Sequence, residues 1–416
     1  MQKRLLLTGI LALAGLSIIG AQDYSSCDGE RYRQDVFDAV DITAAIQFGS
    51  NTTIGGNAQN LFMDVYEPAG DTAQVRPTVV MAFGGAFVAG QREDLDDLCR
   101  TLARKGYVSV TIDYRLFDQF IPLDSNQMHD VVVKAIGDMK AAIRYLREDA
   151  ATSNQFRVDT NLIFAGGISA GAITAAHVAH LDETDDIPNY LQNIIANNGG
   201  IEGNSSNNYQ YSSDVAGLVN YSGALKDARF IDANDPPQLS VHDEGDGIVV
   251  YGNGVVFAGP IVVVYLEGSY SMDQQAQAVG VESRLITYPG NGHVSYFTNN
   301  ADQYQAEVET ATADFLADQI CGEISGTQAL RPALSARAYP NPLPRNQPLR
   351  IRVEGYNGPL QLQIFGMSGA PVAQQALSGG REEALSLPPL PAGVYILELR
   401  AAGNQLAPVR HRIVIQ

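Results

Sequence analysis

Residues 162–171 read Leu-Ile-Phe-Ala-Gly-Gly-Ile-Ser-Ala-Gly, and this stretch decides the fold. Its first residues are apolar and suit a short buried strand. Residues 172–179 are rich in alanine, which favours a helix. Ser169 therefore lies in a sharp turn between a strand and a helix, with glycines where a side chain would collide with neighbouring backbone. Such a turn points the serine hydroxyl into the cleft at the carboxyl end of a sheet, so we expect Ser169 to be a nucleophile.

Strands and helices alternate on both sides of this turn. A helical stripe of apolar residues runs through Met128–Ala150, and Asn193–Asp214 is rich in Asn, Gly and Ser and suits a loop or a partial lid. The alternation predicts an α/β fold with a doubly wound, mostly parallel sheet and helices on both faces. The expected strands are Thr78–Phe83, Val108–Asp113, Leu162–Ala165, Leu218–Tyr221, Leu239–His242 and Arg284–Tyr288.

A serine nucleophile needs a base, and the chain has six histidines. His293 ends the sequence Pro-Gly-Asn-Gly-His, directly after the last expected strand, where a loop with two glycines can carry the imidazole over the cleft. His242 lies at a strand end and is the alternative. We expect His293 to be the base.

The third member of a triad should be a carboxylate on the loop after the penultimate strand. That loop offers Asp243, Glu244 and Asp246. We expect Asp246 to accept a hydrogen bond from the imidazole and to stabilise the imidazolium. The other two carboxylates are expected to lie in a solvated acidic turn.

An oxyanion also needs hydrogen-bond donors. The strand ending at Phe83 continues as Gly84-Gly85-Ala86-Phe87, whose small residues leave backbone N–H groups free. We expect the oxyanion hole to consist of the N–H groups of Gly85, Ala86 and Ala170.

These pieces resemble the carboxylesterase and feruloyl or acetyl-xylan esterase branches of the α/β-hydrolases over about residues 60–318. The family's HGG-x-F motif stands here as residues 83–87, and its H-G-x-x-D-x-x-V-x-Y motif as residues 242–251, which aligns Asp246 with the catalytic acid. Residues 113–116, Asp-Tyr-Arg-Leu, also match. Phe83 replaces the histidine that normally braces the oxyanion loop, which puts the rigidity of this loop in doubt.

The last part of the chain has a different composition. A breaker cluster, Tyr339-Pro340-Asn341-Pro342, precedes short alternating runs separated by turns, which predict a small antiparallel β-sandwich. We expect a catalytic domain over 22–325, a linker over 326–337 and a β-sandwich over 338–416. The expected strands of the sandwich are Leu349–Val353, Leu360–Phe365, Val394–Leu399 and Val409–Ile415.

This tail resembles the C-terminal sorting domain of the bacterial type IX secretion system. The matching features are residues 339–342, the Ile364–Gly369 segment, residues 392–395 and the short final strand. The resemblance implies handling by the type IX machinery and export across the outer membrane, often with removal of the tail. A carbohydrate-binding or adhesion module is the alternative, but the tail has few aromatic residues for stacking on sugars.

The first 21 residues have the pattern of a signal peptide, because Lys3 and Arg4 precede the apolar run Leu5–Ile19 and the small residues Gly20 and Ala21. We therefore expect a secreted or cell-surface protein without stable membrane insertion. Export would permit one disulfide among Cys27, Cys99 and Cys321. Any of the three pairings is possible, with Cys27–Cys321 preferred and Cys99 a buried thiol.

The formal net charge of −19 argues against nucleic acid as a partner. Metal, phosphate and cofactor motifs are lacking, so no cofactor is expected. The leading hypothesis is a carboxylic ester hydrolase that acts through an acyl-enzyme on a small or polymer-linked ester. A polyesterase or a prolyl-oligopeptidase-like peptidase would share the triad. A non-catalytic adhesion protein on this fold generally lacks a member of it.

Overall fold

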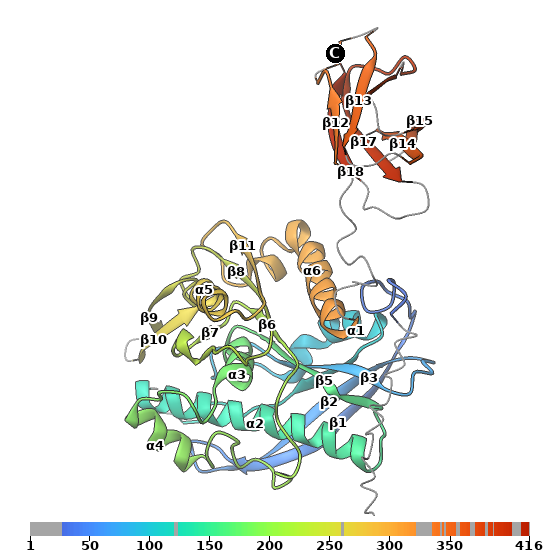
Figure 1. Ribbon diagram of the computed structural model, residues 1–416. Coiled ribbons are helices and arrows are strands. Elements are labelled where there is room, and N and C mark those ends of the chain that lie inside the picture. Colours follow the sequence, from blue (N-terminus) through green and yellow to red (C-terminus); the bar gives the residue numbers. More distant parts are fainter. Residues whose placement is uncertain are drawn as a thin grey trace, which may run out of the picture. The chain divides into compact units, whose positions relative to one another are not determined.

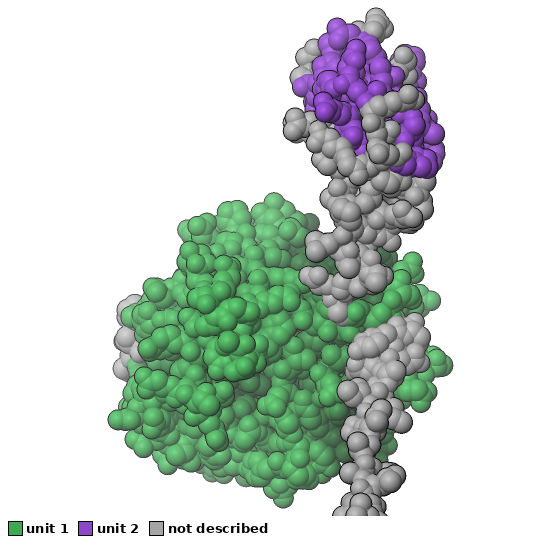
Figure 2. Space-filling model, viewed as in Figure 1, with its two compact units in different colours: residues 1–321 green, residues 322–416 purple. Residues whose placement is uncertain are grey.

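The computed structural model describes residues 27–119, 124–258, 262–321 and, with short gaps, 335–415. The chain divides into two compact units, residues 1–321 and 322–416 (Figure 2). The signal peptide expected over residues 1–21 lies outside the described residues, as does most of the expected linker. Within the described ranges, no helix combines the length and apolarity needed to cross a membrane.

The large unit is built on an eight-stranded sheet with the order β1-β2-β4-β3-β5-β6-β8-β11. Pairing is parallel from β4 through β11 and antiparallel at the β1 and β2 edge. All six strands expected from the sequence are present, with ends shifted by a few residues, which confirms the mostly parallel sheet. The strands are β1 Val40–Thr52, β2 Ala58–Pro68, β3 Arg76–Ala82, β4 Val108–Ile112, β5 Val158–Ile168, β6 Leu218–Tyr221, β8 Gln238–Asp243 and β11 Ser283–Tyr288.

Helices cover both faces of this sheet, with α1 and α6 on one side and α2 and α3 on the other (Figure 1). Helix α2 begins where the Asp124 carboxylate accepts a hydrogen bond from the backbone N–H of Gln127, a capping arrangement that the sequence encodes locally. The helices are α1 Asp96–Arg104, α2 Ser125–Ala151, α3 Ala170–His180, α4 Asn189–Asn197, α5 Ser269–Val279 and α6 Ala301–Cys321.

The central strands of the sheet lie within the hydrophobic core. Every residue of β3 and of β4 is buried, as expected for strands covered by helices on both faces. Their apolar side chains belong to one continuous cluster that includes residues from Tyr32 to Ile320. The carboxyl ends of β5, β8 and β11 thus belong to a well-packed sheet.

A second, small sheet, formed by one strand before β8 and two strands after it, was not expected from the sequence. Strands β7 (Ala224–Leu225), β9 (Asn253–Ala258) and β10 (Val262–Gly268) pair antiparallel in the order β7-β10-β9. The β9–β10 hairpin contributes Val256, Val264 and Leu266 to the wall of a cavity described below.

The segment expected to be a loop or a partial lid begins inside α4. Its remainder, residues 198–214, is irregular and is held along α2 by basic side chains, so the loop is confirmed. None of residues 198–214 lines the cavity beside Ser169, so their contacts give no support for a lid. The anchoring contacts join Lys140 and Arg144 to Glu202, and Arg147 to the carbonyl oxygens of Ser212 and Asp214.

The small unit consists of two antiparallel sheets, which confirms the expected sandwich. Leucine and isoleucine side chains from both sheets share one buried cluster. Strand β12 begins within the expected linker, before the boundary placed at 338. The strands are β12 Ser335–Tyr339, β13 Leu349–Glu354 and β16 Glu382–Leu385 in one sheet, and β14 Leu360–Phe365, β15 Pro371–Leu377, β17 Gly393–Ala401 and β18 Val409–Ile415 in the other.

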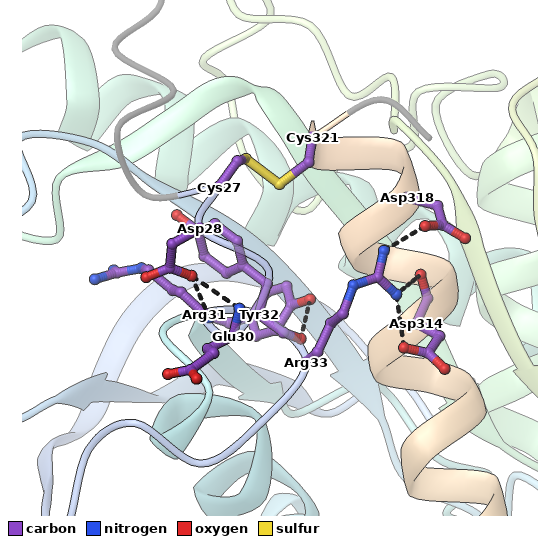
Figure 3. Close-up of a disulfide and its surroundings, with 10 residues drawn as sticks. Cys27, Asp28, Glu30, Arg31, Tyr32, Arg33, Asp314, Asp318 and Cys321 are labelled. Atoms are coloured by element: carbon purple, nitrogen blue, oxygen red, sulfur yellow. Dashed lines mark hydrogen bonds and ion pairs between the residues drawn. A yellow bond between two sulfur atoms is a disulfide. The ribbon is translucent and has the colours of Figure 1, made fainter. Parts of the chain in front are cut away.

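A disulfide joins Cys27 to Cys321 at the end of α6, the pairing that the sequence analysis preferred (Figure 3). Beside it, the Arg33 guanidinium forms ion pairs with Asp314 and Asp318 of the same helix. Cys99 is a free, fully buried thiol, and burial raises its pKa to about 12. The disulfide and the ion pairs fasten the first described residues to the last helix of the large unit.

Candidate active site

Ser169 lies between β5 and α3 in a strained backbone conformation, with φ of 54° and ψ of −116°. The flanking glycines make this turn possible. A Cβ on Gly171 would lie 2.0 Å from the carbonyl oxygen of Ala82, and one on Gly167 would lie 2.3 Å from the carbonyl carbon of Gly171. The strand–turn–helix arrangement expected from the sequence is therefore present, with the hydroxyl at the start of α3.

His293 reaches this hydroxyl from the loop after β11. Its Nε2 lies 2.8 Å from the Oγ of Ser169, although the two residues are 124 positions apart. The next residue, Val294, has a φ of 55°, which is unusual for a β-branched residue. Strain of this kind persists only where the surroundings fix the backbone, as they do around this loop.

Asp246 completes the constellation from the loop after β8. Its Oδ2 lies 2.6 Å from the Nδ1 of His293, and its Oδ1 accepts hydrogen bonds from the backbone N–H groups of Ile248 at 2.8 Å and Val249 at 3.0 Å. Burial alone would raise the pKa of Asp246, but hydrogen bonds from His242 and His293 outweigh it and hold this pKa below its ordinary value. A carboxylate facing Nδ1 fixes the tautomer in which Nε2 can accept the hydroxyl hydrogen of Ser169.

His242, the alternative base, is fully buried and engaged elsewhere. Its Nδ1 lies 2.7 Å from the Oγ of Ser269, and its Nε2 lies 3.0 Å from the Val249 carbonyl oxygen and 3.3 Å from the Oδ2 of Asp246. Among the described residues, its ring makes no hydrogen bond to Ser169. His242 thus supports the carboxylate rather than competing with His293.

Asp243 corrects one expectation from the sequence. It is fully buried rather than solvated, and its carboxylate accepts hydrogen bonds from the backbone N–H of Ser295, at 2.9 Å, and from the Ser295 hydroxyl. Ser295 follows His293 by two positions, so Asp243 anchors the histidine loop. Alternation along β8 gives no signal for this, because every residue of the strand is buried. Glu244 is exposed as expected.

The glycine-rich loop after β3 adopts conformations with positive φ, 127° at Gly85 and 53° at Ala86. A Cβ on Gly85 would lie 2.1 Å from the Ala89 carbonyl oxygen, so no other residue fits there without rearrangement. In the part of the chain that the structure describes, the backbone N–H groups of Gly85, Ala86 and Ala170 have no hydrogen-bond acceptor. These three donors are free to bind an anionic oxygen.

Phe83 occupies the position of the bracing histidine, and a tyrosine supports the loop instead. The hydroxyl of Tyr114 donates a hydrogen bond to the Phe83 carbonyl oxygen at 2.8 Å. The two rings stack with centroids 4.3 Å apart, and the Phe87 ring meets Tyr114 at 6.0 Å. The doubt about the rigidity of this loop is answered by a contact that the sequence analysis missed.

An apolar cavity of about 200 Å³ opens beside Ser169. Within the described residues, no group of three or more histidine, cysteine or carboxylate side chains is arranged to hold a metal ion. The constellation thus offers a hydroxyl, an imidazole, an ionised carboxylate and free N–H donors, which are the components of nucleophilic acyl transfer.

Two family matches fit this architecture. Residues 63–226 match the BD-FAE family, and residues 337–416 match the secretion system C-terminal sorting domain. No curated protein sequence matches the chain.

Solved structures of Thermogutta terrifontis esterase 2 share the fold. Thermogutta terrifontis esterase 2 phosphorylated by paraoxon is 18% identical, with a TM-score of 0.50 over 69% of this chain and 96% of that one. The same esterase phosphoramylated by tabun gives the same values. A truncated carbohydrate esterase from gut microbiota is 18% identical, with a TM-score of 0.48 over 68% of this chain and 97% of that one. The chain thus contains a region, residues 63–226, that matches the BD-FAE family and a C-terminal region, residues 337–416, that matches the secretion system C-terminal sorting domain.

Proposed function

We propose that this protein is an exported carboxylic ester hydrolase that acts through an acyl-enzyme, with Ser169 as nucleophile, His293 as base and Asp246 as the acid of the triad. The observation that carries the proposal is that one imidazole ring bridges a serine hydroxyl, at 2.8 Å, and a buried carboxylate, at 2.6 Å. The residues up to 325 would supply the activity, and residues 338–416 the export signal, joined by the linker 326–337.

In the proposed first half of the reaction, the Oγ of Ser169 attacks the ester carbonyl carbon while the Nε2 of His293 takes the hydroxyl proton. The carbonyl oxygen becomes an oxyanion, which the N–H groups of Gly85, Ala86 and Ala170 bind. Asp246 stabilises the imidazolium. When the tetrahedral intermediate collapses, Nε2 returns the proton to the leaving oxygen and the alcohol departs, leaving the acyl group on Ser169.

In the second half, water replaces the alcohol. His293 takes a proton from this water, whose oxygen attacks the acyl carbon, and the same N–H groups bind the oxyanion again. Collapse breaks the bond to the Oγ of Ser169, which receives the proton from Nε2. The products are the carboxylic acid and the regenerated serine.

The proposed route of export has two steps. The apolar run Leu5–Ile19 would direct the chain across the inner membrane, and the match of residues 337–416 supports type IX handling at the outer membrane. The mature protein would then act outside the cell or at its surface.

A serine-directed fluorophosphonate probe tests the proposal. We expect the protein to be labelled and to hydrolyse p-nitrophenyl esters, and Ser169→Ala to lose both, since loss of the triad serine in subtilisin costs about 10⁶-fold in kcat. Ser222→Ala is the matched control, because Ser222 is also buried at a φ of 54° but hydrogen-bonds to Tyr296. Equal labelling of wild type and Ser169→Ala would refute the assignment.

A further inference from the structure

Apolar side chains from three helices and one hairpin line the cavity beside Ser169. Helix α2 contributes Val133 and Ile136, α3 contributes Ile173, α4 contributes Leu191 and the β9–β10 hairpin contributes Leu266. Val133 and Leu191 also belong to a second hydrophobic cluster, separate from the main core of the large unit. The cavity therefore runs from the serine to the space between α2 and α4.

The position of the cavity relative to His293 identifies the half of the ester that it would receive. Its wall includes Ala86, Ser169 and Ala170, which surround the reacting carbonyl in the proposed mechanism, but it does not include His293. The leaving alcohol must face the Nε2 of His293 to receive its proton. If the alcohol lies on the side of His293, the acyl group extends from the carbonyl carbon in the other direction and enters the cavity.

The volume of the cavity limits the size of this group. A dry apolar cavity of about 150 Å³ in an engineered protein binds benzene, and this cavity measures about 200 Å³. It is thus large enough for an apolar group of about six to eight carbon atoms. An acetyl group would leave most of it empty.

Three side chains with nitrogen atoms, His129, His177 and Lys226, stand in this otherwise apolar wall, and two of them are hydrogen-bonded. The ring nitrogens of His177 lie 2.8 Å from the Ile173 carbonyl oxygen and 3.1 Å from the backbone N of Lys226. The Nζ of Lys226 donates a hydrogen bond to the Tyr265 carbonyl oxygen at 3.0 Å. The ring nitrogens of His129 are buried and have no hydrogen-bond partner among the described residues. Most of the wall is apolar, so a charged or hydroxylated acyl group would be largely unpaired here, and burying it unpaired is costly.

We propose that the cavity is the acyl-binding site of the enzyme and selects an uncharged, apolar acyl group of about six to eight carbon atoms, either a straight chain or an unsubstituted ring. This inference rests on the proposed esterase function. It adds a substrate class that the triad alone does not specify.

A series of p-nitrophenyl esters tests the proposal. From acetate through butyrate to hexanoate we expect kcat/KM to rise about fourfold for each added methylene, the gain typical of burying that group, and to fall at dodecanoate. Benzoate distinguishes a ring from a chain, and the monoester of succinic acid tests an anionic acyl group. A maximum at acetate or at the succinate ester would overturn the proposal.

Two variants of opposite effect locate the acyl group in this cavity. Val133→Phe should reduce kcat/KM for hexanoate and octanoate at least tenfold more than it reduces kcat/KM for acetate. Leu191→Ala should move the optimum to longer chains. Ile195→Ala is the matched control, because Ile195 lies in the same helix and cluster but outside the cavity wall. If Val133→Phe does not fold, Leu191→Ala still decides the question.

Esters that differ in their alcohol test whether the cavity binds the alcohol instead of the acyl group. If Val133→Phe impairs hexyl acetate but not p-nitrophenyl hexanoate, the cavity holds the alcohol and the acyl assignment is wrong. Fluorophosphonate titration counts the active serines in each preparation. Labelled enzyme with a flat chain-length series contradicts this inference alone, whereas an unlabelled protein that hydrolyses none of the esters contradicts the proposed function as well.

Discussion

The hydroxyl of Tyr114 donates a hydrogen bond to the carbonyl oxygen of Phe83, 2.8 Å away, and thereby braces the loop that presents the N–H groups of Gly85 and Ala86. A phenylalanine at position 83 cannot donate a hydrogen bond from its side chain, so the support comes from the neighbouring strand end instead. The contact links the Asp-Tyr-Arg-Leu tract after β4 to the proposed oxyanion hole.

Tyr114→Phe keeps the stacked ring and removes only this hydrogen bond. We expect kcat to fall about tenfold with little change in KM, less than the roughly 3 kcal/mol that losing a whole oxyanion donor costs. Steady-state kinetics measure the split. Tyr107→Phe is the control, because its buried hydroxyl donates to the Tyr32 carbonyl oxygen away from the loop. A larger change in KM than in kcat would mean that the loop supports binding only.

Asp246→Asn should be the most damaging change on the acid loop. The amide presents the wrong partner to the Nδ1 of His293, and the equivalent change in a serine protease triad lowers kcat about 10⁴-fold. Asp243→Asn should cost less, since it loosens Ser295 rather than the imidazole itself. Glu244→Gln, at an exposed position, should have no effect. Measured kcat values that place Asp243→Asn below Asp246→Asn would contradict this order.

Acid should destabilise the protein through His177. Burial lowers the pKa of this histidine to about 4, from an ordinary value of 6.5, and outweighs the hydrogen bond to the Ile173 carbonyl oxygen, which raises the pKa. As the pH falls below 6.5 the unfolded state binds the proton first, so the stability that neutral His177 contributes is lost between pH 6.5 and 4. The loss amounts to roughly 3 kcal/mol at most.

Urea unfolding at pH 7, 5.5 and 4 checks this expectation against His177→Gln. The free energy of unfolding of the wild type should fall more steeply than that of the variant, since all other titrating groups are shared. Parallel curves would show that another group dominates the acid response.

The disulfide should contribute to stability without contributing to activity. Cys27 and Cys321 are 294 positions apart and close a long loop, and removal of a native disulfide typically costs about 2–5 kcal/mol. We expect Cys27→Ser combined with Cys321→Ser to lower the urea midpoint and to leave kcat at 25 °C unchanged. Reductant should reproduce the shift in the wild type and in Cys99→Ala. If reductant also shifted the double variant, another group would be responsible.

The sequence predicted the parts of the fold that are buried on both faces. Short runs rich in β-branched and apolar residues, such as Val108–Ile112, favour buried strands, so β3, β4, β5, β6, β8 and β11 were found. Strand β1 was not predicted, because most of its residues are exposed or half-buried and give no apolar run. Helix α4 was missed because only Leu191 and Ile195 of its nine residues are buried, so its apolar face is narrow.

The candidate site was predictable where chemistry is local and less so where it depends on packing. The turn at Ser169 can be read from its glycines. Asp246 was distinguished from Asp243 mainly by resemblance, because both stand on one loop within a few residues of each other. The brace from Tyr114 and the anchor from Asp243 join segments whose contact only the folded chain reveals.

The tail should be dispensable for catalysis and required for export. The two units have separate buried clusters, the first ending at Ile320 and the second beginning at Ala336, so each can fold around its own core. All triad and oxyanion residues lie in the first unit, and the disulfide that closes it ends at Cys321. We therefore expect a chain ending at Ser325 to keep the melting temperature of the large unit and the full kcat on soluble esters.

In a host with type IX secretion, the same shortened chain should accumulate in the periplasm, because the sorting domain is gone, whereas Ser169→Ala in the full chain should still be exported. Cell fractionation with an antibody against the large unit measures both. If the shortened protein reached the medium, the tail would have another role. A loss of activity restricted to insoluble polymeric esters would favour substrate binding by the tail, since a sorting signal has no reason to distinguish soluble from insoluble substrates.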